Sequence, residues 1–182
     1  MQRLKYSMAD PSDFDAIHRL NYRTFVNEIP QHVPNEARRL VDRFHAQNDY
    51  FVCREDARLV GMVCGRCDRP FSLDQKIPDL DRWLPRHQKA VEVRLLSVEH
   101  AYRKTAVFAG LLKLLSRHYV SLGCDLAVIS GTVRQLKLYR NLGFEPFSRC
   151  IGSDDASYQP MYLTLEAFTR RASHCGSAVA LT

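Results

Sequence analysis

The chain has 182 residues, 46% of them hydrophobic and 25% charged, which is ordinary for one globular domain with a sizeable core. Its formal net charge of +6 fits either a generally basic surface or a phosphate-rich or acidic partner, and without basic runs or basic–aromatic motifs it gives no support to nucleic-acid binding. No apolar run approaches the ~20 residues of a membrane helix, and the N-terminal residues lack the apolar core of a signal peptide. We therefore expect a cytoplasmic protein with no membrane partner.

The first third of the chain predicts a strand, two helices and a hairpin. Asp10 caps the first helix, with Pro11 at its first position and Asp13 completing a start that resembles a capping box. Gly61 and Gly65 in the hairpin mark bulges or the close approach of another backbone. The expected elements cover residues 4–8 (strand), 11–29 and 36–46 (helices), and 50–54 and 59–67 (strands).

A long connection follows the hairpin at residues 69–88. It contains three prolines and Trp83, the only tryptophan of the chain. Connections of this length inside a compact domain are usually functional or mobile. Its apolar side chains are numerous enough to form a lid, to line an extended pocket, or to pack as an excursion with no role in binding, and these alternatives stay open.

The most informative stretch is 91–144, which predicts a strand, a turn, a helix, a second strand and a short helix. The first strand is mostly buried, the first helix has an apolar face, and Gly143 ends the second helix after a start capped by Thr132. The expected ranges are 91–98 and 125–130 for the strands, and 106–121 and 132–142 for the helices.

The turn within this stretch is basic, and it reads Tyr102, Arg103, Lys104 and Thr105. It opens a helix whose first N–H groups have no partners within the helix and whose dipole favours negative charge. Arg103 and Lys104 add formal positive charge at the same place. The turn therefore predicts a site for a phosphate or pyrophosphate.

Taken together, these residues resemble the GCN5-related N-acetyltransferases (GNAT). The signature of that family is a strand ending in apolar-x-Val, a turn of the form Tyr-Arg-Gly-x-Gly-x-Gly/Ala that opens a helix, a second strand, and a helix ending Tyr-x-x-x-Gly-Phe. Here those parts read LLSV, AYRKTAVFAG, DLAVIS and YRNLGF. The sequence departs from the signature at Ala106 and Phe108, which replace glycines, and at Thr132, which replaces a frequent asparagine. Phe108 is bulky at a point where backbone should approach the pyrophosphate.

The long connection, the segment RLNYRTFVNEIPQH and the strand EVRLLSV also resemble one branch of the fold, which contains N-acyl amino acid synthases and acyl-homoserine lactone synthases. Those relatives use acyl carrier protein donors and lack the glycines of the turn, which is consistent with Phe108. Basic residues near the connection are then candidates for docking an acidic carrier protein: Arg82, Arg86, His87 and Lys89.

The resemblance implies an α/β (α+β) fold with a central mixed, mostly antiparallel sheet of about seven strands and about four flanking helices. One domain would cover residues 1–168, with 69–88 inserted between the third and fourth strands, and a flexible tail would follow at 169–182. The co-substrate would be acetyl-CoA or another acyl-CoA, or else an acyl carrier protein, with no metal. Pantetheine and phosphates would contact two segments, Leu96, Ser97 and Val98, and Arg103, Lys104, Thr105, Ala106, Val107 and Phe108.

Two residues match the catalytic positions of the family. Tyr139 corresponds to the usual proton donor to the leaving sulfur, and its alternative role is that of a core aromatic. Glu92 corresponds to a general base, since burial disfavours the charged form of an unpaired carboxyl group, and pairing with Arg94 is the alternative. The histidines that remain as other possible bases are His32, His87 and His100.

The acceptor would be a primary amine of a small molecule, and the sequence does not identify it. By resemblance Glu28, Gln31 and His32 border the acceptor pocket, with Trp83 as a further contact, or else the first three belong to an exposed polar loop. Cys64 and Cys67 form a C-x-x-C within a strand, which favours free thiols over a redox or zinc site. Three functions follow in outline: a short-chain N-acyltransferase using acyl-CoA, a long-chain enzyme using carrier protein, or a non-catalytic binding domain.

Overall fold

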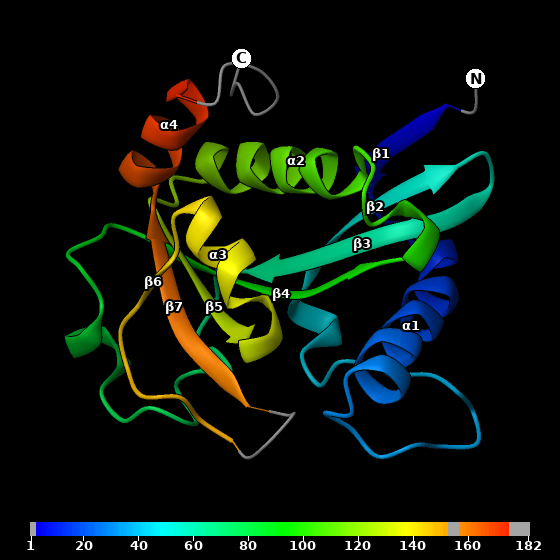
Figure 1. The fold of residues 1–182 in the computed structure, drawn as a ribbon, viewed down its shortest axis with the longest axis horizontal. Coiled ribbons are helices and arrows are strands. Elements are labelled where there is room, and N and C mark those ends of the chain that lie inside the picture. Colours follow the sequence, from blue (N-terminus) through cyan, green and yellow to red (C-terminus); the bar gives the residue numbers. More distant parts are fainter. Residues whose placement is uncertain (1–2, 153–156, 175–182) are drawn as a thin grey trace. The chain divides into compact units, whose positions relative to one another are not determined.

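The computed structural model describes residues 3–152 and 157–174, which form a seven-stranded sheet and four α-helices (Figure 1). The order in the sheet is β1-β2-β3-β4-β5-β7-β6, and β4 and β5 run parallel while β1–β2, β2–β3, β5–β7 and β6–β7 are antiparallel. This confirms the expected fold class. The strands are β1 (Leu4–Met8), β2 (Asp49–Glu55), β3 (Arg58–Arg66), β4 (Ala90–Val98), β5 (Leu126–Thr132), β6 (Glu145–Pro146) and β7 (Tyr158–Thr164). The helices are α1 (Phe14–Tyr22), α2 (Val107–Ser121), α3 (Leu136–Leu142) and α4 (Leu165–His174).

The chain divides into two compact units. Unit 1 consists of Met1–Gly65 and Leu95–Arg117, and unit 2 consists of Arg66–Arg94 and His118–Thr182. The strand β4 and the helix α2 therefore each contribute residues to both units. The parallel pairing of β4 with β5 follows from the α2 crossover between them, because parallel neighbours need a long connection.

In unit 1, α1 covers one face of the β1–β2–β3 sheet. The expected capping box is confirmed, with the Asp10 side chain accepting from Ser12 N–H and the Asp13 side chain accepting from Asp10 N–H at 3.0 Å, and it opens a 3₁₀ turn that continues into α1. The helix then widens into a π-helical segment, η2 (Arg23–Glu28). The apolar face of α1 packs in one cluster with alternate residues of the strands: Ile17, Leu20, Tyr50, Val52, Met62 and Cys64.

The first turns of α2 cover the other face of this sheet (Figure 1). A Cβ atom at Gly61 would lie 2.6 Å from Cγ1 of Val107, so the close approach expected at Gly61 exists and is made by a side chain. The pairing of β2 and β3 also shifts register between Cys53 and Arg54, as expected for a bulge beside Gly61. Tyr6 in β1 fixes the same helix, because its hydroxyl donates to Ala106 O at 3.0 Å and its ring lies over Gly110.

The helix expected at 36–46 is wrong, since that segment is a loop ending in a short 3₁₀ turn, η3 (His45–Gln47). Asn35 explains the difference, because its side chain binds both the N–H and the C=O of Arg39 and so competes with helical bonds. Arg38 also has a φ of 49°, outside the right-handed helical region. Val41 in this loop is exposed.

In unit 2, the long connection 69–88 packs its apolar side chains against β4 and β5. Phe71, Leu73, Ile77 and Leu80 are buried, in one cluster with Ala90, Leu126 and Val128 of β4 and β5. Trp83 lies at the end of a 3₁₀ turn, η4 (Leu80–Trp83), and remains half exposed. The connection is thus anchored by its first half, and its only tryptophan contributes little to that core.

The helix α3 lies against β5 in unit 2 and ends at Gly143, as expected, where φ is 103°. Thr132 precedes the 3₁₀ turn η6 (Val133–Gln135) without a capping bond from its side chain, so that part of the prediction is wrong. Residues 169–174 continue α4, an amphipathic helix supported by the Arg170–Glu166 ion pair, where the sequence predicted a tail; the rest of that predicted tail, 175–182, lies outside the described residues.

Within residues 3–152 and 157–174, no helix is long and apolar enough to cross a membrane, and no group of three or more His, Cys, Asp or Glu residues is arranged to hold a metal ion. None of the five cysteines of this part forms a disulfide. Two of them, Cys67 and Cys124, lie in unit 2 with their sulfur atoms 3.2 Å apart, so the close thiol pair is not the C-x-x-C pair of the sequence.

Candidate functional site: a basic turn in unit 1 and a buried carboxylate in unit 2

The basic turn lies in unit 1, between β4 and α2. The strand ends at Val98, a 3₁₀ turn η5 (His100–Tyr102) follows, and α2 begins at Val107. Thr105 closes the turn, because its hydroxyl donates to Tyr102 O at 2.7 Å and accepts from Val107 N–H at 3.4 Å. The fold thus delivers exposed backbone and basic side chains to the N-terminus of a fifteen-residue helix, which is the arrangement that binds anions.

Arg103 is oriented within this turn by two contacts. Its Nε donates to Val98 O at 3.0 Å, and its guanidinium forms an ion pair with Glu28 of η2. Sequence reasoning placed Arg103 with the phosphates and Glu28 with the acceptor, and the structure brings these two side chains together. Both are well exposed, so the pair is weak and can exchange with another anion.

Further acidic groups accompany the turn. Glu99 pairs with Arg23, and the Tyr102 hydroxyl donates to Glu55 at 2.5 Å. That hydrogen bond with Glu55, together with burial, raises the pKa of Tyr102 above its usual value of 10.0. The positive charge of the turn is therefore partly neutralised by the protein's own carboxylates.

The segment predicted to contact pantetheine lies at the C-terminal end of β4. Leu96 is half buried, while Ser97 and Val98 are buried. Leu95, directly before them, has a φ of 52°, which is costly for a branched side chain and is found mainly where surrounding structure imposes it. Lys104, Ala106 and Phe108 complete the predicted donor site; the first two are exposed and Phe108 is half buried.

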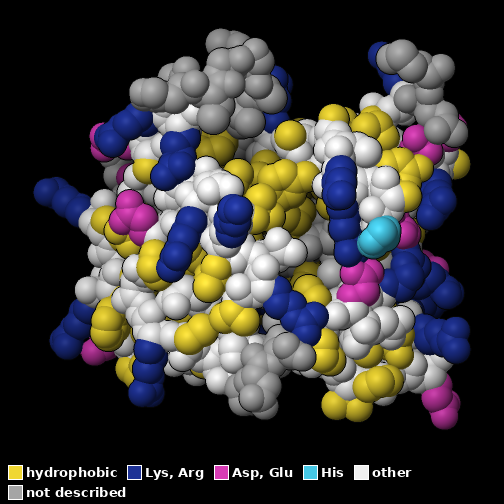
Figure 2. All heavy atoms as spheres, viewed as in Figure 1, with side chains coloured by type: hydrophobic (Ala, Val, Ile, Leu, Met, Phe, Trp, Pro, Cys, Tyr) yellow, Lys and Arg dark blue, Asp and Glu magenta, His cyan; other side chains and the backbone are white. Residues whose placement is uncertain are grey.

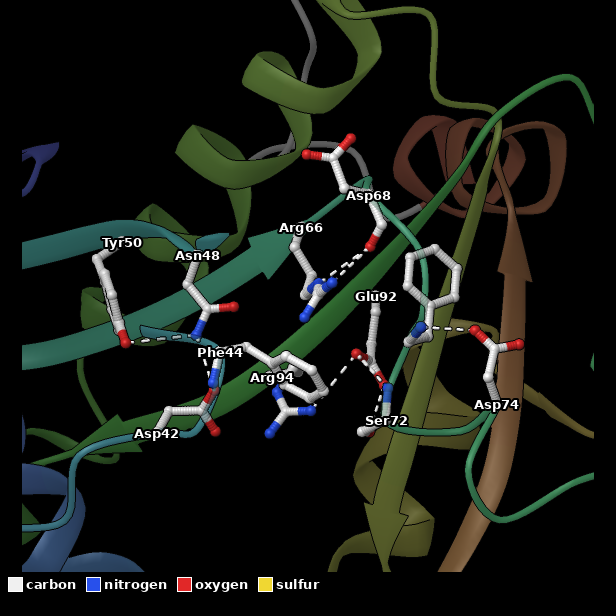
Figure 3. Close-up of polar contacts among 11 residues, drawn as sticks. Asp42, Phe44, Asn48, Tyr50, Arg66, Asp68, Ser72, Asp74, Glu92 and Arg94 are labelled. Carbon is white, nitrogen blue, oxygen red and sulfur yellow. Dashed lines mark hydrogen bonds and ion pairs between the residues drawn. The ribbon is translucent and has the colours of Figure 1, made fainter. Parts of the chain in front are cut away.

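Glu92 lies in unit 2 with 1% of its surface exposed. The peptide N–H of Ser72 donates to both carboxylate oxygens at 2.9 Å, and the Ser72 hydroxyl donates to Oε1. Arg94, on the same strand, places Nη1 3.4 Å from Oε2 (Figure 3). The pairing with Arg94, which was the alternative to an unpaired general base, is present, so the premise of an unpaired carboxyl group is wrong. The closer donors come from Ser72, a residue that no sequence pattern selected.

Tyr139 lies on α3 in the same unit. Its ring packs against Gly131 of β5, where a Cβ atom would be 2.8 Å from Cδ2, and meets Phe144 edge-on at a centroid distance of 6.2 Å. Burial raises the pKa of Tyr139 above 10.0, partly opposed by hydrogen bonding with Thr132. The phenol is therefore neutral at ordinary pH and keeps a proton to donate.

The other residues predicted to contact the acceptor belong to different units: Gln31 and His32 to unit 1, and Trp83 to unit 2. Gln31 is half buried, with its N–H donating to Phe25 O at 3.1 Å, and His32 is exposed in the loop after η2. Of the alternative bases, His100 is exposed and His87 is half buried, with Nδ1 2.9 Å from Pro85 O.

Sequence reasoning missed a polar and aromatic group in unit 1. The Asn48 amide donates to Asp42 at 3.0 Å and to the Tyr50 hydroxyl at 3.3 Å (Figure 3). His45 Nδ1 lies 3.1 Å from the same hydroxyl. The ring of His18 meets that of His45 at 4.8 Å, and burial, followed by the charge of His45, lowers the pKa of His18 below 6.5. Only the loop 36–48 brings these residues together, and its path was not predicted.

Basic side chains elsewhere are scattered over the face seen in Figure 2 and are interrupted by acidic ones. This distribution agrees with the absence of basic runs in the sequence, and no extended basic stripe is visible on that face.

Comparison with known proteins identifies the family. The family model described as N-acyl amino acid synthase FeeM matches residues 16–164. The solved structure of FeeM, an N-acyl amino acid synthase from uncultured soil microbes, is similar with a TM-score of 0.75 at 18% identity over 94% of this chain and 96% of that one. A comparison with curated proteins found no match.

Two other solved structures, of different enzymes, are also similar to this chain. The acyl-homoserine lactone synthase LasI has a TM-score of 0.75 at 16% identity over 99% of both chains. The acetyltransferase yncA from Salmonella typhimurium, solved with acetyl-CoA, has a TM-score of 0.60 at 18% identity over 89% of this chain and 94% of that one. The sheet, the helices and the family match agree: the chain is an acyltransferase with the GNAT fold and belongs to the FeeM family of N-acyl amino acid synthases.

Proposed function

We propose that the protein transfers a long-chain acyl group from a thioester on an acyl carrier protein to the amine of an amino acid. The family supports the reaction class and the kind of acceptor. The observation that carries the choice of donor is the turn before α2, where Arg103 is paired with Glu28 and Phe108 occupies the first helical turn. A crowded and partly neutralised anion site suits the single phosphate of a phosphopantetheine arm better than the several phosphates of CoA.

The donor arm would lie along the end of β4. The strand β4 pairs with β5 over Ala90–Glu92. The backbone of β4 after Glu92 could therefore form hydrogen bonds with the amides of an extended pantetheine, in the way that a peptide adds as a strand to the edge of a sheet. The phosphate would then reach the N–H groups from Arg103 to Phe108, where the helix dipole favours it. Arg103 would exchange Glu28 for the phosphate.

In the chemical step the amine nitrogen attacks the thioester carbonyl. A C–N bond forms, the C–S bond breaks, one proton leaves the nitrogen, and the thiolate needs a proton. Glu92 would take the proton from nitrogen, directly or through water, and Tyr139 would give its proton to sulfur. A buried carboxylate already oriented by hydrogen bonds and a neutral phenol suit these two roles.

A second candidate uses a short acyl-CoA. It is favoured by the exposed basic side chain of Lys104 and by the solved structures of a synthase with isopentyl-CoA and of an acetyltransferase with acetyl-CoA among the similar folds. The two candidates differ in the acyl donor, and in both the acceptor is an amine.

Thermal unfolding with a panel of donors separates them. A ligand at one hundred times its dissociation constant stabilises by about 2.7 kcal/mol, which for this chain length raises Tm by about 5–11 °C. We expect such a shift with long-chain acyl carrier protein and a smaller one with long-chain acyl-CoA. A shift with acetyl-CoA alone would overturn the proposed donor in favour of the second candidate.

A further inference from the structure

The long connection 69–88 brings one polar residue against the buried carboxylate of Glu92. Ser72 is 6% exposed, and it donates to Glu92 through two different groups, its peptide N–H and its hydroxyl. Figure 3 shows the Glu92 side chain pointing from β4 toward Ser72, with Arg94 on the other side of the carboxylate. A single residue of the connection therefore contacts both oxygens of the only acidic side chain in β4.

Ser72 is itself held in place. Its neighbours Phe71 and Leu73 are 1% and 0% exposed and belong to the core cluster of unit 2. Asp74 closes the turn around it, because its N–H donates to Phe71 O at 3.2 Å and its carboxylate accepts from Phe71 N–H. The serine is thus anchored by packing on both sides, and its two donors have a fixed direction.

We infer that Ser72 is a positioning residue for acyl transfer, acting through Glu92; this inference rests on the proposed function. A buried carboxylate is costly unless donors replace its water, and Ser72 supplies the close ones while Arg94 supplies the charge. The hydroxyl and the shared N–H occupy Oε1, whereas Oε2 has the shared N–H and the longer Arg94 contact. Each oxygen therefore accepts from two donors, and Ser72 supplies three of these four contacts.

The steady-state assay with the long-chain donor tests this with matched variants. Ser72→Ala removes the hydroxyl and should lower kcat by about 10- to 100-fold, since it deletes one bond to a charged group, with the donor KM unchanged. Ser72→Thr should restore most activity, and Ser116→Ala, whose hydroxyl bonds only the backbone of α2, should match wild type.

A double variant shows whether Ser72 acts through Glu92. Ser72→Ala should lower the residual rate of Glu92→Gln no further, as expected for residues that act as one unit. An equal loss in both backgrounds, or Ser72→Ala with wild-type kcat, would overturn the inference. If Ser72→Ala does not fold, Ser72→Cys, a weak donor of similar size, should show the same loss of kcat with the donor KM unchanged. A wild-type protein that is inactive with every thioester would instead refute the proposed function, and this inference with it.

Discussion

Replacing Gly131 by alanine tests how β5 and α3 fit together at the proposed proton donor. The new methyl group would lie 2.8 Å from Cδ2 and 2.9 Å from Cε2 of Tyr139, and 3.4 Å from the sulfur of Met161. Since Phe144 meets the Tyr139 ring edge-on, the ring has little room to move. Such overpacking costs about 1–3 kcal/mol, and each kcal/mol lowers Tm by about 2–4 °C for a chain of this length.

We therefore expect Gly131→Ala to lower Tm by about 2–12 °C in calorimetry, and to lower kcat because the phenol is displaced. In a Tyr139→Ala background the same glycine substitution should cost far less, because the clashing ring is gone. An unchanged Tm in the single variant, or an equal loss in both backgrounds, would refute the packing argument.

Three further predictions use other contacts. Glu28→Gln releases Arg103 and should lower the KM for a phosphate-bearing donor by up to about fivefold, with little change in Tm, because the pair is exposed; a raised donor KM would contradict this. Burial raises the pKa of Tyr6 to about 12, so the stability contributed by its neutral hydroxyl is fully present below pH 10 and is lost as pH rises toward 12. Wild type should consequently be more stable than Tyr6→Phe at pH 7, and the gap in Tm should close above pH 10; a constant gap would rule this out. Mild oxidation with diamide should join Cys67 to Cys124, with loss of two hydrogens by mass spectrometry, and Cys67→Ser should abolish it; a bridge between any other pair would count against the 3.2 Å contact.

Much of the fold could be predicted because several elements have sequence signals within their own residues, and the structure buries the apolar residues that those signals place in the core. The capping box at Asp10, the apolar strand at 91–98 and the stop at Gly143 each specify an element without help from distant residues. The helix expected at 36–46 does not form, because the Asn35 side chain binds the backbone of the residue four positions later. Such competition from a side chain does not change the spacing of apolar residues, so the hydrophobic pattern of the sequence cannot reveal it. The helix α4 was missed although Thr164 and Glu166 favour a helix start.

The site was predictable in its chemistry and not in its contacts. Arg103, Glu92 and Tyr139 were selected by their place in a family pattern, which fixes positions along the chain. Glu28 against Arg103 and Ser72 against Glu92 join residues that lie 75 and 20 positions apart, so they depend on the path of the chain between them. Residues such as Ser72 can be recognised only once the long connection is seen to fold back onto β4.

The central claim is that this chain joins an acyl group to an amine. The most direct measurement incubates the protein with a mixture of amino acids and, in parallel, long-chain acyl carrier protein, long-chain acyl-CoA and acetyl-CoA, and identifies the products by mass spectrometry. We predict an N-acyl amino acid from the long-chain carrier donor, with one free thiol released per amide, and loss of that product in Glu92→Gln. Intact thioester and no amide with all three donors would contradict the account.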